Sequence, residues 1–348
     1  MASAVHPVGA GSTPPAAGER MTAALSGDRR SVSMLMSLVE DGGPEARQVL
    51  SQLYPHTGRA YRVGVTGSPG AGKSTLVSEM AKIYRQHGER VGIVTVDPTS
   101  PFSGGALLGD RIRMRELSTD PGVFIRSMAT RGSLGGLARA TADVVSVLDA
   151  AGFDPVLIET VGAGQSEVDI ARTADTTIVI EMPSAGDEVQ AIKAGILEIA
   201  DILVVNKADL PGADNAVAAL RAMLDLGVSQ NIRHHGQGME TASVPGAAPA
   251  AGEWRTPLLK TCALRGEGIA EVVAAVAEHR RHLLDSGQRQ RQLRSQVEEQ
   301  IRRILRQELL ARLLERLPAS ELEGAVDRVT ERREDPYSAA AGLIALVS

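Results

Sequence analysis

The amino-acid sequence predicts an α/β fold in which a mostly parallel central sheet is flanked by helical segments at both ends of the chain. The first observation is that short apolar runs alternate with longer amphipathic ones from Tyr61 onward, the pattern of strands joined by crossover helices. The second is that most of the short runs are continuous Val, Ile and Leu, as expected of strands buried on both faces. The third is a glycine-rich turn directly after the first predicted strand, a setting in which such sheets bind phosphates.

The chain divides into four segments. Residues 1–20 are rich in Ala, Pro and Gly without a hydrophobic run, which predicts a disordered tail and not a signal peptide. Residues 21–60 have a helical pattern that Gly42, Gly43 and Pro44 break into two helices. Residues 61–286 form the predicted sheet domain, which includes a predicted surface loop at 231–256. Its strands are predicted at Arg62–Thr66, Val91–Val96, Val123–Ser127, Pro155–Glu159, Thr176–Glu181, Ile202–Val205 and Leu258–Thr261.

Residues 287–348 form a predicted helical arm. Apolar residues repeat at helical spacing as far as Leu317, and Pro318 ends this long helix. Two shorter helices are predicted around Glu321–Arg333 and Pro336–Val347. A long amphipathic helix outside the sheet domain must bury its apolar stripe, either within the monomer or in a dimer.

The composition narrows the class of protein. A hydrophobic fraction of 43% is ordinary for a soluble globular protein, and a formal net charge of −5 argues against a general nucleic-acid binder. The single cysteine, Cys262, excludes internal disulfides and cysteine-based metal clusters. No apolar run is long enough to span a membrane, so we expect a soluble cytoplasmic protein.

A phosphate-binding loop follows the first strand. Its residues are Gly67-Ser68-Pro69-Gly70-Ala71-Gly72-Lys73-Ser74, which match G-x-x-x-x-G-K-S between a strand and a helix. The glycines let backbone N–H groups surround phosphate oxygens at the positive end of the helix. Lys73 can place its charge on the β- and γ-phosphates, and the Ser74 hydroxyl can ligate Mg²⁺. Lysine is scarce in this chain, at five of 37 basic residues, and arginine cannot replace a compact ammonium group.

Acidic residues near two further strand ends predict the rest of a magnesium site. Asp97 ends the second strand at the sheet edge where ligands bind, although an Asp before Pro also forms turns. Asp110 lies in the following glycine-containing loop, a candidate first switch. Glu159 ends the fourth strand, with Gly162 three residues later. In that pattern the acid orients water on Mg²⁺ and the Gly162 N–H bonds the γ-phosphate.

The tetrapeptide Asn206-Lys207-Ala208-Asp209 follows the sixth strand and indicates guanine recognition. The Asp209 carboxylate can accept from guanine N1–H and N2–H₂, whereas adenine has no matching donors on that edge. The Lys207 stem can lie along the base. Asn206 can tie this loop, Asn206–Asp209, which we call the base loop, to the phosphate loop. Ala263, at the end of the last strand, can offer its N–H to guanine O6, and Cys262 is predicted to be a small buried residue, not a nucleophile.

Together these motifs predict a P-loop protein that binds and hydrolyses GTP. The predicted nucleotide-binding residues are Gly67, Ser68, Pro69, Gly70, Ala71, Gly72, Lys73, Ser74, Thr75, Asn206, Lys207, Asp209, Cys262, Ala263 and Leu264. The predicted catalytic residues are Lys73, Asp110, Glu159 and Gly162.

The motifs in this order resemble the methylmalonyl-CoA mutase-associated GTPases of the MeaB/ArgK type. Three runs add to the resemblance, namely Pro55–Ala60, Glu159–Glu167 and Ala194–Asp201, and it extends from about Met21 to the C-terminus. It implies a P-loop NTPase with a SIMIBI-type G domain. It also implies a G-protein chaperone that gates delivery of adenosylcobalamin to a separate acyl-CoA mutase chain and protects or reactivates that enzyme. We expect no cobalamin site in this chain itself.

The resemblance also implies site residues. It assigns Mg²⁺ to Ser74, Asp97, Asp110 and Glu159, and a third switch to about Ser184–Lys193. Lys193 would couple partner binding to hydrolysis, unless it is an ordinary surface lysine. The C-terminal helices would form a homodimer. One departure is that Ser184-Ala185 precede Gly186 where the family usually has Pro-Gly-x-Gly, which leaves the geometry of this switch open.

The sequence argues against two other functions. A metal-insertion GTPase would need His or Cys ligands near the switches, whereas Cys262 lies in the base-binding region and His234-His235 in a separate loop. A kinase-like regulator of basic amino-acid transport would need a phosphate acceptor, and the sequence contains no distinct one. Neither membrane nor nucleic-acid partners are expected.

Overall fold

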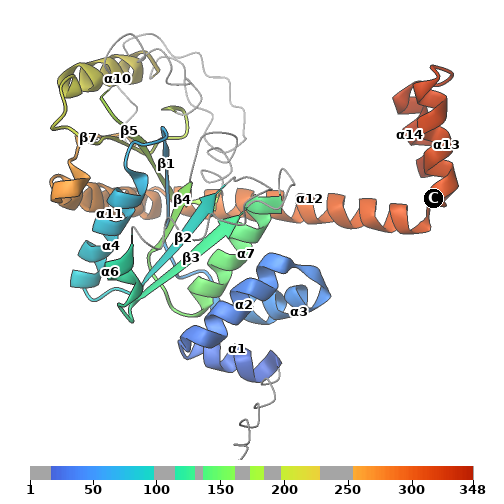
Figure 1. Ribbon diagram of the computed structural model, residues 1–348, viewed down its shortest axis with the longest axis horizontal. Helices are drawn as coiled ribbons and strands as arrows, with labels where there is room; N and C mark the ends of the chain where they lie inside the picture. The colour runs from blue at the N-terminus through green and yellow to red at the C-terminus, as the bar shows by residue number, and fades with distance from the viewer. Residues whose placement is uncertain are drawn as a thin grey trace, which may run out of the picture. The chain divides into compact units, whose positions relative to one another are not determined.

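The computed structural model describes residues 17–97, 114–129, 136–160, 173–183, 197–227 and 254–347. The chain forms two compact units, Met1–Arg289 and Gln290–Ser348. Figure 1 labels the elements of both units. No helix in the described ranges is both long and apolar enough to cross a membrane.

The first unit is built on a sheet of seven parallel strands in the order β3-β2-β4-β1-β5-β6-β7. This confirms the predicted parallel sheet, and each predicted strand is present with ends that differ by at most two residues. The strands are β1 (Arg62–Gly67), β2 (Val91–Asp97), β3 (Val123–Ala129), β4 (Val156–Thr160), β5 (Thr176–Glu181), β6 (Ile202–Val205) and β7 (Leu258–Lys260).

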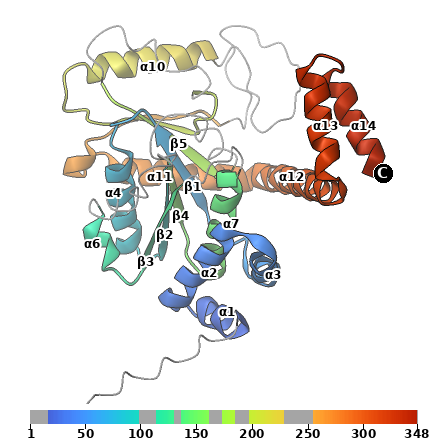
Figure 2. The same cartoon turned by 45° about the vertical axis from the view of Figure 1, so that its right-hand side comes forward.

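Helices cover both faces of the sheet (Figure 2). One face carries α4 (Lys73–Gln86) and α11 (Ile269–Asp285), which pack on Val63 and Val65 of β1. The other carries α7 (Gly136–Ala150), which packs on alternate residues of β2 and β4 such as Val94 and Ile158. Because successive strand residues point to opposite faces, continuous apolar runs supply both cores. The shorter α6 (Arg115–Ser118) lies beside α4, and α10 (Ala213–Gly227) packs on β6 and β7.

The N-terminal segment contains three α-helices, where the sequence predicted two. They are α1 (Ala17–Leu25), α2 (Arg29–Asp41) and α3 (Gly43–Leu53), followed by a 3₁₀ turn at Tyr54–His56. Helix α1 begins four residues inside the predicted tail. Asp28 separates α1 from α2 because its carboxylate caps α2, accepting from the Ser31 N–H at 2.8 Å. Residues of all three helices share a core with α7, so the segment belongs to the sheet domain.

The loop between this segment and β1 is held by Asp149 of α7. The Asp149 carboxylate accepts from three consecutive backbone N–H groups, those of Gly58, Arg59 and Ala60, at 2.6, 3.1 and 3.0 Å. A charged acceptor on several N–H groups makes strong hydrogen bonds. This contact gives the run Pro55–Ala60 a structural role.

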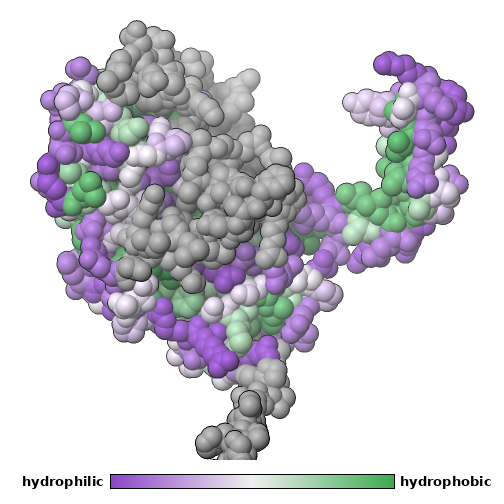
Figure 3. All heavy atoms as spheres, viewed as in Figure 1, coloured by the Kyte–Doolittle hydropathy of each residue, from purple (hydrophilic) through white to green (hydrophobic). Residues whose placement is uncertain are grey.

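The second unit contains most of α12 (Gln288–Arg316), followed by α13 (Ala319–Thr330) and α14 (Pro336–Val347). The three predicted helices are present. Helix α12 contains no buried residue, and large apolar side chains along it are exposed, among them Ile301, Leu305 and Leu309. Hydrophobic residues gather where α12 approaches α13 (Figure 3). In the part of the chain that the structure describes, the apolar stripe of α12 is exposed.

Candidate functional site

The phosphate loop joins the central strand β1 to α4, and two of its glycines are required by their surroundings. Gly67 has a φ of +133°, and a Cβ there would lie 1.9 Å from the Ile180 carbonyl oxygen. Gly72 has a φ of +94°, and a Cβ there would lie 2.3 Å from Asn206 Nδ2. A side chain at Gly67 would displace the backbone of β5, and one at Gly72 would displace the amide end of the Asn206 side chain. The glycines thus let the loop lie directly against both neighbours.

Lys73, the first residue of α4, turns back over the loop. Its buried Nζ donates to the backbone oxygens of Gly67 at 2.8 Å and Ser68 at 3.1 Å. Gly72 is the N-cap of α4 and has no side chain to cap the first turn. The positive end of the helix and an ammonium group therefore meet at one concave loop, which suits an anion such as a phosphate. Pro69 and Gly70 form the exposed crest of this loop.

Ser74 and Glu159, two of the four predicted magnesium ligands, are brought together. Ser74 Oγ donates to Glu159 Oε1 at 2.5 Å, and Glu159 at the end of β4 is only 1% exposed. A hydroxyl beside a buried carboxylate is a set of oxygen ligands that suits Mg²⁺. Asp97 ends β2, the strand next to β4, but its side chain lies outside the described residues, as do Asp110, Gly162 and Lys193. No group of three His, Cys, Asp or Glu side chains placed to hold a metal occurs in the described ranges.

Asn206 links the base loop to the phosphate loop, as predicted. Its buried side chain donates from Nδ2 to the Ala71 oxygen at 2.7 Å. Its Oδ1 accepts from Thr261 Oγ1 and from the Ala263 N–H, both at 3.0 Å. The Ala263 N–H, predicted to serve a guanine oxygen, therefore has Asn206 as its partner here. The reason is that the β7 end approaches Asn206 closely enough to complete its hydrogen bonds.

Asp209 lies at the outer end of the same loop. Its Oδ1 accepts from Cys262 Sγ at 3.2 Å, and its Oδ2 lies 3.6 Å from Arg265 Nη1. The hydrogen bond from Cys262 is the main cause that lowers the pKa of Asp209, and Arg265 adds to it, so the carboxylate is ionised near neutral pH. Burial and the bond to Asp209 raise the pKa of the Cys262 thiol, which favours the predicted non-nucleophilic role. Lys207 approaches Met182 Sδ, 3.9 Å from its Nζ.

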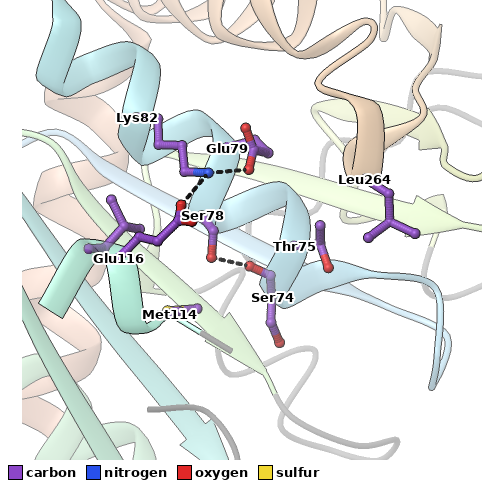
Figure 4. A pocket seen from close by; sticks show the side chains of 9 residues that line it. Ser74, Thr75, Ser78, Glu79, Lys82, Met114, Glu116 and Leu264 are labelled. Atoms are coloured by element: carbon purple, nitrogen blue, oxygen red, sulfur yellow. Dashed lines mark hydrogen bonds and ion pairs between the residues drawn. The ribbon is translucent and has the colours of Figure 1, made fainter. Parts of the chain in front are cut away.

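Thr75 and Leu264 line a pocket of about 240 Å³ beside the phosphate loop. Figure 4 shows Leu264 on the turn after β7 and Thr75 on the first turn of α4. Lys82 closes the far end, where its Nζ contacts Glu79 at 2.8 Å and Glu116 of α6 at 3.1 Å. Leu264 is 85% exposed, so an apolar surface is available at the entrance. The pocket joins the phosphate loop to the turn that follows β7.

Two residues of the site were not predicted. Glu181 at the end of β5 is buried and accepts from Ser68 Oγ at 2.6 Å, and its backbone oxygen accepts from the Asn206 N–H at 2.8 Å. An acid that ends a buried strand was a signal for it, as it was for Glu159. Arg265 has no such signal, because its contact with Asp209 joins residues 56 positions apart in a chain rich in arginine.

A family model described as "Methylmalonyl Co-A mutase-associated GTPase MeaB" matches residues 32–317. A putative GTPase of Pyrococcus abyssi is 48% identical over 314 residues, which cover 90% of this chain and 91% of that protein. The GTPase ArgK of Escherichia coli is 34% identical, over 82% of this chain and 83% of its own length. A mouse protein, the mitochondrial methylmalonic aciduria type A homolog, is 38% identical over 66% of this chain and 51% of its own length.

A solved structure has a similar fold along nearly all of the chain. It is described as a LAO/AO transport system kinase, has a TM-score of 0.68 and is 26% identical, over 95% of this chain and 97% of the other.

Proposed function

This chain belongs to the family of methylmalonyl-CoA mutase-associated GTPases described as MeaB, and we propose that its GTP hydrolysis is the switch of a chaperone for an acyl-CoA mutase. In this proposal it gates delivery of adenosylcobalamin to the mutase and protects or reactivates that enzyme. The observation that carries the proposal is the family match over residues 32–317. The mutase would be a separate polypeptide, either methylmalonyl-CoA mutase or a close relative.

We propose that the phosphate loop binds the β- and γ-phosphates of GTP through Lys73 and the N–H groups that open α4. The contacts of Lys73 with two loop oxygens support this, because the ammonium is already held at the concave side of the loop. Phosphoryl transfer needs positioning and charge stabilisation more than covalent catalysis. A fixed ammonium beside helix N–H groups supplies both.

Magnesium would be held by Ser74 and Glu159, together with Asp97 and Asp110. The direct contact of Ser74 with Glu159 supports this assignment. When bound, Mg²⁺ would neutralise charge on the β- and γ-phosphate oxygens. Glu159 would also orient the metal's waters, and Gly162 would bond the γ-phosphate.

Guanine would be read by Asp209, with Lys207 along the base and Cys262, Ala263 and Leu264 nearby. Support comes from the ionised state of the Asp209 carboxylate, since only that form accepts from two base donors. Asp209→Asn should exchange preference for guanosine nucleotides for preference for xanthosine nucleotides, because the amide can donate to the extra carbonyl. Competition binding of GDP and XDP measures this, and undiminished GDP binding by the variant would contradict the base assignment.

The partner would be sensed through the third switch at Ser184–Lys193, where Lys193 couples partner binding to hydrolysis. The C-terminal unit would form a homodimer, a proposal supported by the exposed apolar side chains along α12. Burying such a stripe against a second copy would remove it from water.

The chaperone proposal is tested with acyl-CoA mutases purified from the same organism. GTP turnover is measured alone and with each mutase, in wild type and in Lys73→Ala as the control without phosphate-loop chemistry. Turnover should rise with the cognate mutase, and only in wild type. Capture of the mutase from cell extract should also differ between GTP-loaded and GDP-loaded protein. If no mutase of that organism changes the turnover of an active protein, the chaperone role is wrong.

A further inference from the structure

The turn after β7 carries a pair of charged residues that face the proposed base-reading carboxylate. Backbone hydrogen bonds close the turn between Cys262 and Glu267, from the Cys262 N–H to the Glu267 oxygen at 3.0 Å and from the Glu267 N–H to the Cys262 oxygen at 3.2 Å. Within it, the Arg265 N–H donates to the Cys262 oxygen at 2.9 Å. The turn therefore sets where the side chains of Arg265 and Glu267 begin.

Glu267 fixes the guanidinium of Arg265 by a two-point contact. Arg265 Nε lies 2.9 Å from Glu267 Oε1, and Nη2 lies 3.1 Å from Oε2. Such a fork-to-carboxylate contact constrains the plane of the guanidinium as well as its position. The third nitrogen, Nη1, is left directed at Asp209 Oδ2, 3.6 Å away.

The two carboxylate oxygens of Asp209 thus have different partners, and both partners belong to the turn after β7. Cys262 Sγ donates to Oδ1 and Arg265 Nη1 faces Oδ2. An ionised carboxylate has about four lone-pair sites, and its hydrogen-bond donors here are the Cys262 thiol and the backbone N–H of Asp209 itself, so sites are left for the donors of a base. These contacts restrict rotation about the last bond of the Asp209 side chain, which is 36% exposed. Reading two donors at once requires one orientation of the carboxylate plane.

We propose that Arg265, held by Glu267, is a positioning residue that orients Asp209 for guanine and so sets the selectivity for its 2-amino group. This inference rests on the proposed role of Asp209 as the base reader. Arg265 acts through Asp209 and needs no contact with the nucleotide. Its effect is therefore on which base is accepted and how tightly.

The test compares GDP with IDP, whose base lacks the 2-amino group, in competition against a fluorescent GDP analogue. Arg265→Ala should weaken GDP binding about 2- to 5-fold, the size expected of a half-exposed ion pair, and should weaken IDP binding less. It should raise KM for GTP without a matching fall in kcat. Glu267→Ala should move the GDP/IDP ratio in the same direction, and Arg265→Lys should restore part of it.

A matched control is Arg280→Ala, which removes a similar arginine–aspartate pair elsewhere in the same unit. Arg280 is 38% exposed and lies 3.4 Å from Asp154, compared with 51% and 3.6 Å for Arg265 and Asp209. This variant should leave the GDP/IDP ratio unchanged. A general loss of stability would move both nucleotides equally.

A double-mutant cycle with Asp209→Ala distinguishes the positioning role of Arg265 from the base-reading role of Asp209. If Arg265 acts through Asp209, then Arg265→Ala should change GDP affinity by less than about 1.5-fold when Asp209 is already absent. An equal loss in both backgrounds, or an equal loss of GDP and IDP, overturns the positioning role. If Asp209→Ala itself leaves GDP binding unchanged, the base assignment fails instead.

Discussion

Asn206 provides a quantitative test of how the site is assembled. Its buried side chain makes three hydrogen bonds, to the Ala71 oxygen, to Thr261 Oγ1 and to the Ala263 N–H. At about 1 kcal/mol for each, Asn206→Ala should lower the free energy of unfolding by about 3 kcal/mol. Groups left buried without a partner would add to this loss. Because the phosphate loop and the base loop lose their link, GDP affinity should also fall about tenfold, equivalent to about 1.4 kcal/mol.

The variant Asn206→Asp separates the hydrogen bond to Ala71 from the two bonds to Thr261 and Ala263. The aspartate keeps an oxygen to accept from Thr261 and Ala263, but it loses the donor to Ala71 and places a carboxylate oxygen beside that carbonyl. It should therefore weaken GDP binding at least as much as the alanine variant does, while the hydrogen bonds from Thr261 and Ala263 are kept. Asn215→Ala, an exposed asparagine in α10, is the matched control.

The assays are urea unfolding followed by circular dichroism, and GDP binding by calorimetry. If Asn206→Ala and Asn215→Ala have the same free energy of unfolding and the same GDP affinity, the hydrogen bond to Ala71 does not hold the site together. If stability falls but GDP affinity does not, the link is structural and the two loops bind nucleotide independently.

The other predictions concern single groups. Lys73→Ala should reduce GTP turnover at least 100-fold because the phosphate loop loses its ammonium, measured by phosphate release; retained turnover would exclude this role. Ser74→Ala should raise the Mg²⁺ concentration needed for half-maximal turnover several-fold, and an unchanged Mg²⁺ titration would remove Ser74 from the metal site. Burial raises the pKa of Asp201 to about 7, against 3.8 when exposed, while a hydrogen bond from the Thr177 N–H opposes the shift. The folded chain thus keeps a proton on Asp201 that the unfolded chain releases, so the stability that this group contributes is fully present below about pH 4 and is lost as the pH rises through about 7. The variant Asp201→Asn, with the neighbouring His279 at 3.5 Å left in place, should reduce the difference in free energy of unfolding between pH 5 and pH 8, measured by urea unfolding. Parallel pH profiles for the two proteins would contradict this.

The strands could be predicted because parallel strands that are buried on both faces have mostly apolar sequences. Ile202–Val205 is a continuous apolar run, and Thr176–Glu181 has an apolar centre at Ile178–Ile180; the predicted bounds of both strands agree with the structure. The helix count at the N-terminus was not predictable to the same degree. Helix α1 is short, and its residues Met21 and Ala24 pack on the α7 core, a tertiary contact that local pattern does not contain.

The candidate site was predictable where chemistry and spacing coincide. The glycines and Lys73 of the phosphate loop, and the acid that ends β4, have few alternative reasons for that pattern behind a strand. Their mutual contacts needed the fold. Ser74 and Glu159 are 85 positions apart, and they meet because β1 and β4 are neighbours in the sheet although not in sequence.

The parallel sheet followed from the sequence alone, which also predicts the phosphate loop and guanine recognition by Asn206–Asp209, because each depends on residue types at short, fixed spacing. The side-chain contacts at the carboxyl edge of the sheet depend on the tertiary structure. The strand order brings β5 and β7 beside β1 and β6, so Glu181 reaches Ser68 and Arg265 faces Asp209. The physical reason is that these contacts depend on distances across the sheet, which a linear pattern does not encode.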